Sequence, residues 1–353
     1  MYPNLGPSSL IYFLLYIVVV IGALSEPLQP YKPNRVWQYV TIIFFVLLSG
    51  LRYHLGDTET YRLYYDGILD INDFEKGYAF INVLFNTLHF NFMLFLFVIT
   101  GITGFLIKKS FENRWFFFAM LMILGKLATL YAFSGLRQWI ALCICFYAIY
   151  LLQKGKWKYF LLVVFIAMQF HRSAMVLFPM ALFYGRDFKY RVAFVTVIVA
   201  VFIGYSSKEF FQAAGDINPA LNLGVYLEDG GNEVGMNAMN WIENFAILIP
   251  AIIFRNRLKD KVPNYDFFLY MHLIYCAFLI AGSDFGIIKR LRDYYVTGYF
   301  VLVPSFMYLF PPKQRKIYLA LAIIYFGLLF FRSLNFYFNV GNYDSILFHL
   351  NDV

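Results

Sequence analysis

The chain has 353 residues, of which 61% are hydrophobic and 14% are charged, and its formal net charge is +8. A soluble domain carries about 25% charged residues, and no polar stretch here exceeds roughly 35 residues, so we expect no water-soluble domain. Apolar runs of roughly 15 to 20 residues recur along the whole length, which predicts an all-α polytopic integral membrane protein.

These runs predict about 11 to 12 transmembrane segments in a single transmembrane domain over residues 1–353. The N-terminal stretch MYPNLGPSSL has no basic residue, so the first run is expected to be a membrane span and not a cleaved signal peptide. The run 79–107 is long for one crossing, and its first part is expected to form a separate helix at the membrane surface. The predicted spans are 9–24, 36–51, 79–107, 115–133, 137–153, 158–170, 173–184, 191–206, 240–254, 266–282, 294–310 and 317–331.

The runs 158–170 and 173–184 flank the polar stretch QFHR. Each run has about 13 residues and reaches about 20 Å as an α-helix, which is shorter than the roughly 30 Å hydrocarbon core. We therefore predict a broken or re-entrant pair whose tip, at His171 and Arg172, lies at membrane depth. Irregular backbone at that depth is tolerated only where it is buried in protein or lines a wet cavity.

Six short connections hold most of the 29 Lys and Arg residues. Because short basic loops stay in the cytoplasm, these connections are predicted to face inward and both termini outward. Two large loops, 52–78 and 207–239, are then expected on the outer side, the second as a partly helical flap. The basic connections are 25–35, 108–114, 154–158, 185–191, 255–266 and 311–316.

Arginines from four separate regions lie on the predicted outer side. A guanidinium presents several donors in a planar fork that matches phosphate oxygens. Arginines that converge at the membrane surface therefore predict a site for a lipid-linked phosphate or pyrophosphate. The alternative is that each arginine anchors its helix end by reaching to the interface. The four candidate residues are Arg52, Arg137, Arg172 and Arg290.

Two residues are candidates for a general base, which must lie within hydrogen-bond reach of the proton it takes. His171 adjoins Arg172 at the predicted tip, and Asp57 follows Arg52 in the first outer loop. Asp57 and Glu59 also have the spacing of an Asp-x-Glu metal pair, but two acids at this spacing are common by chance, so a metal site is the less favoured interpretation. Further candidate site residues are His54, Gln138, Arg292 and Tyr294.

Two other residue classes admit a structural and a functional interpretation. Tyrosines gather at the outer borders, where they form either an interfacial aromatic belt or a platform for sugar rings. The three cysteines lie inside apolar runs, have no zinc-site spacing and are predicted to be packing residues. The tyrosine clusters are Tyr61, Tyr64 and Tyr65, and Tyr294, Tyr295 and Tyr299.

Four stretches of the sequence resemble motifs of the EpsG-like, Wzy-type polysaccharide polymerases. In chain order they are GLRYHLGDTETYRLYYDGI, FEKGYAFINVL, the pair GLRQ and FHRSA, and IIKRLRDYYV. The order and spacing fit from about residue 36 to 310, and the pair GLRQ and FHRSA is the most specific part. The family pattern has Gly-Thr/Ser-Asp after the first arginine, whereas this chain has Gly56-Asp57-Thr58. The first motif is therefore slightly altered, although its arginine and aspartate remain.

The resemblance implies a multi-span, GT-C-like glycosyltransferase of the bacterial inner membrane that acts at the periplasmic face without a metal or other cofactor. Such enzymes transfer a growing glycan from undecaprenyl pyrophosphate to the non-reducing sugar of a lipid-linked repeat unit. The implied partners are the lipid-linked donor and acceptor glycans, the lipid bilayer and a chain-length regulator protein, and no nucleic acid. The product class, O-antigen of lipopolysaccharide, capsule or exopolysaccharide, stays open.

The expected mechanism is one direct displacement with inversion. Pyrophosphate is already a good leaving group, so the protein has to hold the charge that develops on it, which preorganised arginines do well. The acceptor hydroxyl needs a base, for which His171 is the first choice and Asp57 the second. The arginines expected to hold the pyrophosphate are Arg172, Arg137, Arg290 and Arg52.

Two alternative functions remain. Another polyprenyl-linked glycosyltransferase, such as an O-antigen ligase, would share the arginine cluster but make a single addition where a polymerase makes a ladder of repeats. A transporter or flippase for lipid-linked sugars would carry charges at mid-bilayer on several helices. The candidate charges here lie on the outer side, which disfavours the transporter.

Overall fold

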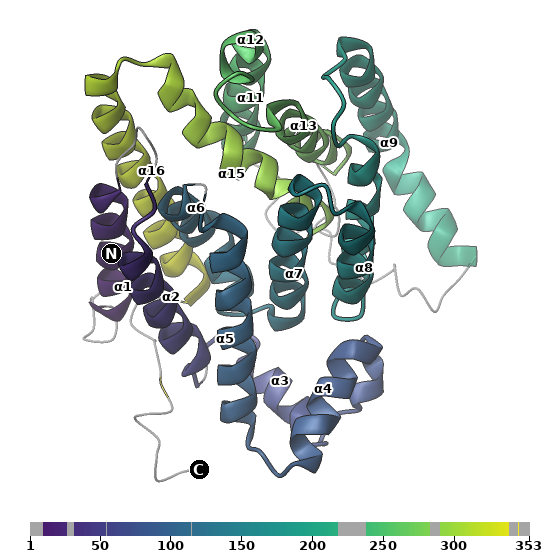
Figure 1. The fold of residues 1–353 in the computed structure, drawn as a ribbon. Coiled ribbons are helices and arrows are strands. Elements are labelled where there is room, and N and C mark those ends of the chain that lie inside the picture. The colour runs from purple at the N-terminus through teal and green to yellow at the C-terminus, as the bar shows by residue number, and fades with distance from the viewer. Residues whose placement is uncertain are drawn as a thin grey trace. The chain divides into compact units, whose positions relative to one another are not determined.

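The computed structural model describes residues 10–26, 32–53, 55–113, 115–217, 238–282, 290–338 and 345. Most of these residues form helices, and the extended pairing among them is one isolated bridge between Arg52 and Ser345. The predicted all-α fold is therefore confirmed (Figure 1).

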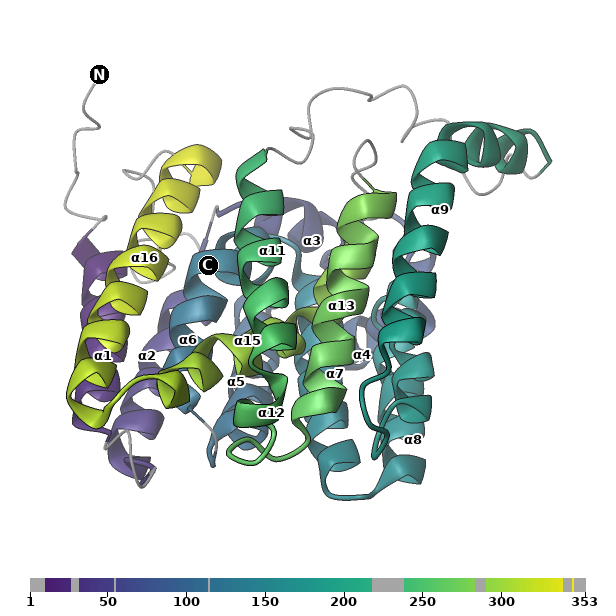
Figure 2. The same ribbon diagram turned by 90° about the horizontal axis from the view of Figure 1, so that it is seen from above.

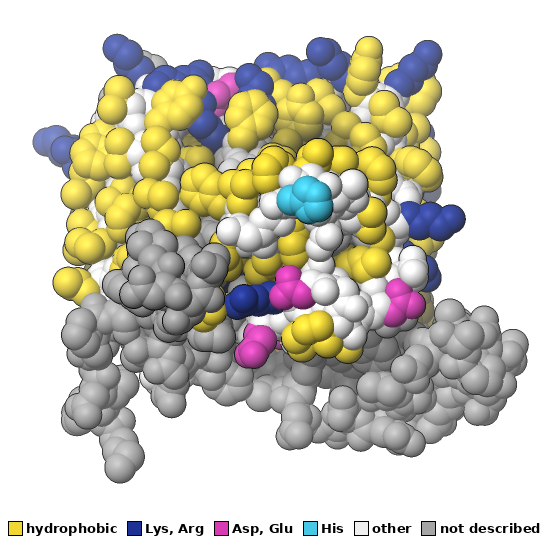
Figure 3. All heavy atoms as spheres, turned by 90° about the horizontal axis from the view of Figure 1, so that it is seen from below, with side chains coloured by type: hydrophobic (Ala, Val, Ile, Leu, Met, Phe, Trp, Pro, Cys, Tyr) yellow, Lys and Arg dark blue, Asp and Glu magenta, His cyan; other side chains and the backbone are white. Residues whose placement is uncertain are grey.

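Among the described residues, three helical segments are both long and apolar enough to cross a membrane, at 92–111, 136–153 and 312–335. Eight shorter apolar helices of 10–17 residues accompany them there. Many large apolar side chains on these helices are exposed, among them Leu14, Ile43 and Phe105. Figure 3 shows hydrophobic side chains covering much of one face. Such a surface is unfavourable in water and suits a lipid environment.

The chain divides into two compact units, residues 1–175 with 311–353, called unit 1 here, and residues 176–310, called unit 2. The boundary falls inside η4 (Arg172–Leu182). The other elements of unit 1 are α1 (Leu10–Ser25), α2 (Arg35–Gly50), α3 (Thr58–Tyr65), η2 (Ile71–Asp73), α4 (Lys76–Thr87), α5 (Phe92–Phe111), α6 (Phe116–Ile123), η3 (Leu124–Ala132), α7 (Leu136–Gln153), α8 (Trp157–Met168) and α16 (Pro312–Phe338).

Unit 2 is built around α13 (Tyr265–Ala281), which packs against its neighbours α9, α11 and α15 (Figure 2). The Arg255 guanidinium donates to the Asp266 carboxylate, with 2.7 Å between Nε and Oδ1, and fixes the start of α13 beside α12. The elements of unit 2 are α9 (Tyr190–Ile217), α11 (Ala238–Ile253), α12 (Arg255–Leu258), α13, η6 (Asp293–Tyr295), α15 (Val296–Ser305) and η7 (Phe306–Leu309). The helix α9 extends beyond the predicted span and into the predicted outer loop 207–239.

The predicted break between two short segments is confirmed. The first half, α8, has 12 residues, and the second half, η4, is a 3-10 helix of 11 residues. At about 1.5 Å and 2.0 Å per residue these halves reach about 18 Å and 22 Å. Neither half spans a hydrocarbon core of roughly 30 Å. The segment 79–107 is also divided as expected, into α4 and α5.

In unit 1 a group of basic residues lies at one end of the helices. Glu112, after α5, is bound by Arg35 at 2.8 Å and by Lys108 and Lys109 at 3.0 Å each. The other ends of α2 and α5 lead to α3 and α4, where Arg52 and the start of α7 also lie (Figure 1). Within unit 1, Arg52 and Arg137 thus lie at the end opposite to the Glu112 cluster, and which end faces outward stays a prediction. We call the second end the α3–α4 end.

Candidate active site

Glu75, which immediately precedes α4, connects two of the predicted arginine regions. Its Oε2 lies 2.7 Å from Nη1 of Arg137 at the start of α7. Its Oε1 accepts a hydrogen bond of 3.1 Å from the backbone N–H of Arg172 at the start of η4. The Glu75 and Arg137 side chains are only 12% and 26% exposed. One carboxylate therefore holds the most specific motifs of the sequence together, the Arg of GLRQ and the Arg of FHRSA.

The Arg137 guanidinium is oriented by three neighbours. Its central carbon lies 3.9 Å from the centre of the Phe74 ring, in a cation–π contact. Besides the ion pair with Glu75, its charge interacts with the nearby Tyr61 hydroxyl. Its buried Nε has no hydrogen-bond partner among the described residues. A guanidinium has five N–H donors, so Arg137 is held in place with donor capacity to spare.

The first turn of α4 supports the broken backbone between α8 and η4. The first N–H groups of a helix have no partner inside the helix, and here Tyr78 N–H donates to the Gln169 carbonyl at 3.1 Å. In the opposite direction, Arg172 N–H donates to Glu75. At Gly77 a β-carbon would lie 2.6 Å from the Gln169 Cβ and 2.7 Å from its carbonyl oxygen, so this close approach requires glycine. The backbone of the break is therefore hydrogen-bonded to the start of α4, in accord with the requirement that polar backbone groups at membrane depth find partners in the protein.

The electrostatics of this contact keep Glu75 ionised. Burial alone raises the pKa of its carboxyl group. The backbone hydrogen bond from Arg172 and the charges of Arg137 and His171 act in the opposite direction, and the pKa of Glu75 is lowered overall. Glu75 is therefore a carboxylate at neutral pH, and His171 lies within the reach of its charge.

The two residues of the predicted tip present different groups. The His171 ring is half-buried, and its Nδ1 forms a hydrogen bond with the Ser173 hydroxyl. The Arg172 side chain is exposed, although its backbone N–H is held by Glu75. The structure thus fixes the backbone of this pair and leaves the guanidinium of Arg172 at the surface.

Asp57 lies at the edge of the same cluster. Its side chain is exposed just before α3, and its backbone N–H donates to the Ser134 hydroxyl at 3.3 Å. Burial raises the pKa of the Tyr61 hydroxyl, Arg137 opposes this shift, and the charge of Asp57 adds to it. The carboxylate of Asp57 is therefore close to the Tyr61–Arg137 contact.

Two further candidates in unit 1 are buried. Arg52 is 0% exposed. Its guanidinium donates to the Thr58 hydroxyl at 2.8 Å and to the Ser49 carbonyl, and so ties the end of α2 to the start of α3. Gln138 is also buried, next to Arg137 on α7. A contact of Arg52 or Gln138 with a phosphate group stays a prediction.

The last candidate region belongs to unit 2. Arg290 is exposed, and Tyr294 is fully buried. Arg292 pairs with Asp293 at 3.0 Å and lies over the Tyr275 ring at 4.8 Å. The convergence of Arg290 with the arginines of unit 1 stays a prediction.

The remaining sequence predictions have three different outcomes. His54 lies outside the described residues. The three cysteines are unbonded and buried, as expected of packing residues. Within the described ranges no three His, Cys, Asp or Glu side chains are grouped so that they could hold a metal ion.

Glu75 and Phe74 were not among the sequence candidates, and Tyr61 was named only as a member of a tyrosine cluster. All three lie in the quoted motifs, Glu75 and Phe74 in FEKGYAFINVL and Tyr61 in the preceding one. A signal was present, since Glu75 is an acidic residue at the start of an apolar run on the side predicted to carry the arginines. What the sequence did not show is which arginine this acid would bind.

The comparisons with known proteins give one match. The model of the EpsG family matches residues 35–345, which is most of the chain and includes every motif named above. No curated protein and no solved structure matches the chain significantly.

Proposed function

Because the chain belongs to the EpsG family, a family of Wzy-like polymerases, we propose that it polymerises lipid-linked repeat units of a polysaccharide. In this proposal a growing glycan on undecaprenyl pyrophosphate is transferred to a hydroxyl of a second lipid-linked repeat unit at the periplasmic face of the inner membrane. The observation that carries the proposal is the contact of Glu75 with Arg137 and with the backbone of Arg172, which assembles an oriented guanidinium, an exposed guanidinium and a histidine at one end of unit 1.

The proposed step is a single displacement with inversion. The acceptor oxygen forms a bond to the anomeric carbon, the bond from that carbon to the pyrophosphate oxygen breaks, and undecaprenyl pyrophosphate leaves with the electron pair. The acceptor hydroxyl loses its proton to a base. The leaving group is already weakly basic, so the largest contribution of the protein is to stabilise its charge, and no metal is part of this step.

In this mechanism Arg137 and Arg172 hold the pyrophosphate. Arg137 is oriented by Phe74 and Glu75 before substrate binds, so its side chain loses little conformational entropy on binding. The Arg172 side chain is exposed, so its guanidinium can reach the leaving group by a change of side-chain rotamer, without movement of the backbone. Charge-assisted hydrogen bonds contribute about 1.5–3 kcal/mol each. Arg52 and Arg290 are further proposed contacts.

His171 is the proposed base. Its Nδ1 is paired with the Ser173 hydroxyl. The proposal uses the tautomer in which Nδ1–H donates to that hydroxyl, so that the lone pair on Nε2 takes the proton from the acceptor. The carboxylate of Glu75 lies near enough to affect His171 electrostatically and would favour the imidazolium that forms. Asp57, at the edge of the cluster, is the second choice.

Glycan analysis of a deletion strain complemented with variants tests the proposal. We expect Arg137→Ala or Arg172→Ala to leave single repeat units on the lipid carrier and to abolish the ladder of longer products at unchanged protein level. Normal chain lengths in both variants would refute the proposal that these arginines bind the pyrophosphate. A single addition in place of a ladder in the wild-type strain would indicate a ligase or another single-step transferase. Wild-type polymer from His171→Ala would exclude His171 as the base, and loss of turnover with a chelator would overturn the metal-free step.

The proposed orientation has an independent test. The natural cysteines are buried, whereas Thr60 at the α3–α4 end and Lys156 at the other end of unit 1 are exposed. A membrane-impermeant maleimide should label Thr60→Cys in spheroplasts, and Lys156→Cys only after lysis. The reverse labelling pattern would place the candidate site on the cytoplasmic face.

A further inference from the structure

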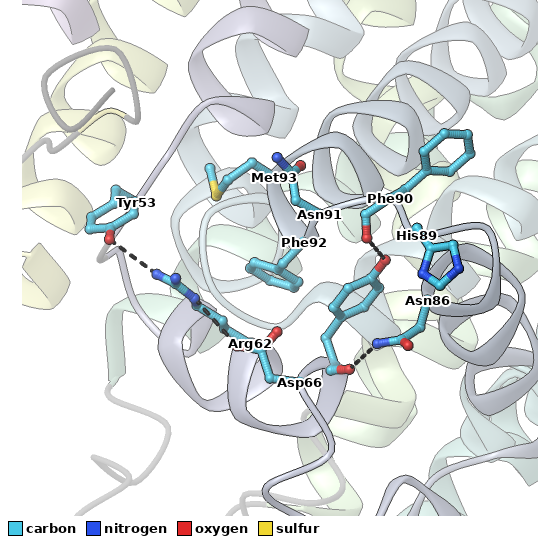
Figure 4. A pocket seen from close by; sticks show the side chains of 10 residues that line it. Tyr53, Arg62, Asp66, Asn86, His89, Phe90, Asn91, Phe92 and Met93 are labelled. Carbon is cyan, nitrogen blue, oxygen red and sulfur yellow. Dashed lines mark hydrogen bonds and ion pairs between the residues drawn. The ribbon is translucent and has the colours of Figure 1, made fainter. Parts of the chain in front are cut away.

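Unit 1 contains a second polar site, apart from the Glu75 cluster. It is a pocket of about 320 Å³ between α3 and the turn that joins α4 to α5 (Figure 4). This volume is at the lower end of the roughly 300–1,000 Å³ that small-molecule sites have. None of the residues considered for the displacement reaction lines the pocket.

The walls of this pocket are fixed by hydrogen bonds between the two elements. The Tyr65 hydroxyl donates to the Phe90 carbonyl at 2.7 Å, and the Asn86 side-chain amide donates to the Tyr65 carbonyl at 3.0 Å (Figure 4). His89 adopts a left-handed backbone conformation, with φ of +57°, and makes the tight turn between α4 and α5. The pocket is therefore formed before any ligand arrives.

The polar lining is a balanced set of donors and acceptors. The Arg62 guanidinium donates to the Tyr53 hydroxyl at 3.1 Å and lies 3.6 Å from the Asp66 carboxylate. The Arg62 and Asp66 side chains are 39% and 44% exposed, so both have atoms available to a ligand. A neighbouring guanidinium and carboxylate can donate to and accept from the hydroxyl groups of a neutral ring.

The apolar lining complements this set. The rings of Tyr65 and Phe92 pack against each other with centroids 5.6 Å apart and form part of the wall. Flat apolar surfaces beside a few directed polar groups suit a sugar ring, which has apolar C–H faces and polar edges. A pyrophosphate is a poorer match because the one arginine in the lining is already paired with a carboxylate. A polyprenyl chain is a poorer match because the pocket is small and polar.

Helix α3 connects this pocket to the proposed reaction site. Tyr61 on α3 packs against Phe74, with ring centroids 6.1 Å apart, and the Arg137 guanidinium lies over the same Phe74 ring. The adjacent Arg62, with Asp66, lines the pocket. A glycan whose reacting sugar lies at Arg137 would therefore have further sugars within reach of α3. We propose that the pocket binds an uncharged sugar residue of the glycan chain at a distance from the reacting bond and retains the chain between additions. The identity of the glycan in this inference rests on the proposed polymerase function.

The matched test replaces both members of the charged pair by neutral amides, in the double variant Arg62→Gln with Asp66→Asn. A half-exposed ion pair contributes little to stability, so the variant should fold. The probe is the one-repeat oligosaccharide released by mild acid from the lipid carrier of the host strain, titrated calorimetrically into the protein in nanodiscs. We expect the Kd to rise by about tenfold or more, and the polymer made in cells to become shorter while polymerisation continues.

Two controls keep the outcome interpretable. Lys156→Gln removes an exposed cation at the other end of unit 1 and should change neither affinity nor chain length. Tyr53→Phe deletes only the hydroxyl that Arg62 binds and should weaken binding less than the double variant does. Unchanged affinity and chain length in the double variant would overturn the inference, and so would a wild-type protein that does not bind the oligosaccharide. Persistent polymer from Arg137→Ala would instead count against the reaction site and leave the binding result standing.

Discussion

Replacing Glu75 by glutamine tests the contact that holds the candidate site together. Glutamine keeps the shape of the side chain but removes its charge. The carboxylate makes two charge-assisted hydrogen bonds, to the Arg137 guanidinium at 2.7 Å and from the Arg172 N–H at 3.1 Å. Bonds to charged groups contribute about 1.5–3 kcal/mol and neutral ones about 0.5–1.5 kcal/mol. Both partners are N–H donors, and glutamine has one acceptor oxygen and turns its NH2 group towards the other donor, so it can keep at most one of the two bonds. We therefore expect Glu75→Gln to reduce the free energy of unfolding by at least about 2 kcal/mol.

The pairwise part of this loss can be isolated with a double-mutant cycle. The experiment measures thermal or denaturant unfolding in detergent for Glu75→Gln, Arg137→Met and the double variant. The control is Asp260→Asn, which changes an exposed acid of unit 2. We expect a coupling energy of about 1–2 kcal/mol between Glu75 and Arg137, because their side chains are mostly shielded from water. Additivity of the two single effects within about 0.5 kcal/mol would refute the claim that this ion pair organises the site.

The same cycle has a functional readout. Loss of Glu75 leaves the Arg137 guanidinium and the backbone of the break less constrained, without removing a group that the mechanism assigns to the pyrophosphate. Polymer formation by Glu75→Gln should therefore fall but remain measurable, whereas Arg137→Ala should abolish it. Wild-type turnover in Glu75→Gln at reduced stability would make the contact structural alone.

Three other predictions address pH, packing and the basic end of unit 1. The lowered pKa of Glu75 means that its stabilisation is present above the unfolded-state pKa of about 4.3 and is lost as pH falls through the lower folded-state pKa. The stability difference between wild type and Glu75→Gln should thus shrink on acidification from about pH 6 to pH 3, and an increase would contradict the assignment. Gly77→Ala should lower the melting temperature and polymer yield because its β-carbon would overlap Gln169, whereas Gly101→Ala, with no atom within 4 Å of the added carbon, should change neither. Glu112→Gln should weaken the contacts of one carboxylate with three cations and lower the melting temperature, while polymer length, measured on the folded fraction, stays unchanged.

The sequence determined where the helices lie. The observed α1, α2, α7, α11 and α13 begin and end within a few residues of the predicted spans. This succeeds because a helix in lipid must satisfy its backbone internally and present apolar side chains over its whole length, so that the pattern is local in sequence. The same local arithmetic predicted the break at QFHR, since two runs of about 13 residues cannot each cross the membrane.

Local sequence was less informative about helix type. Residues 116–132 form one continuous helical segment, but its second half, η3, is a π-helix of 9 residues that ends just before the GLRQ motif. The second half of the break is likewise a 3-10 helix where an α-helix was expected. Such departures depend on how neighbouring segments pack, and π-helical segments occur often near functional sites.

Only the tertiary structure decided which charged groups meet. Arg137 and Glu75 are 62 residues apart in the chain, and Arg172 and Glu75 are 97 apart, so no periodicity or spacing links them. Arg52 and Arg172 looked alike in sequence, each following an apolar run. In the structure Arg52 is fully buried between α2 and α3, and Arg172 has an exposed side chain. The composition fixes a membrane protein with arginines at the helix ends, because lipid imposes that pattern on every segment. The role open to each arginine follows from the neighbours that folding supplies, and for Arg137 the neighbour that decides is Glu75.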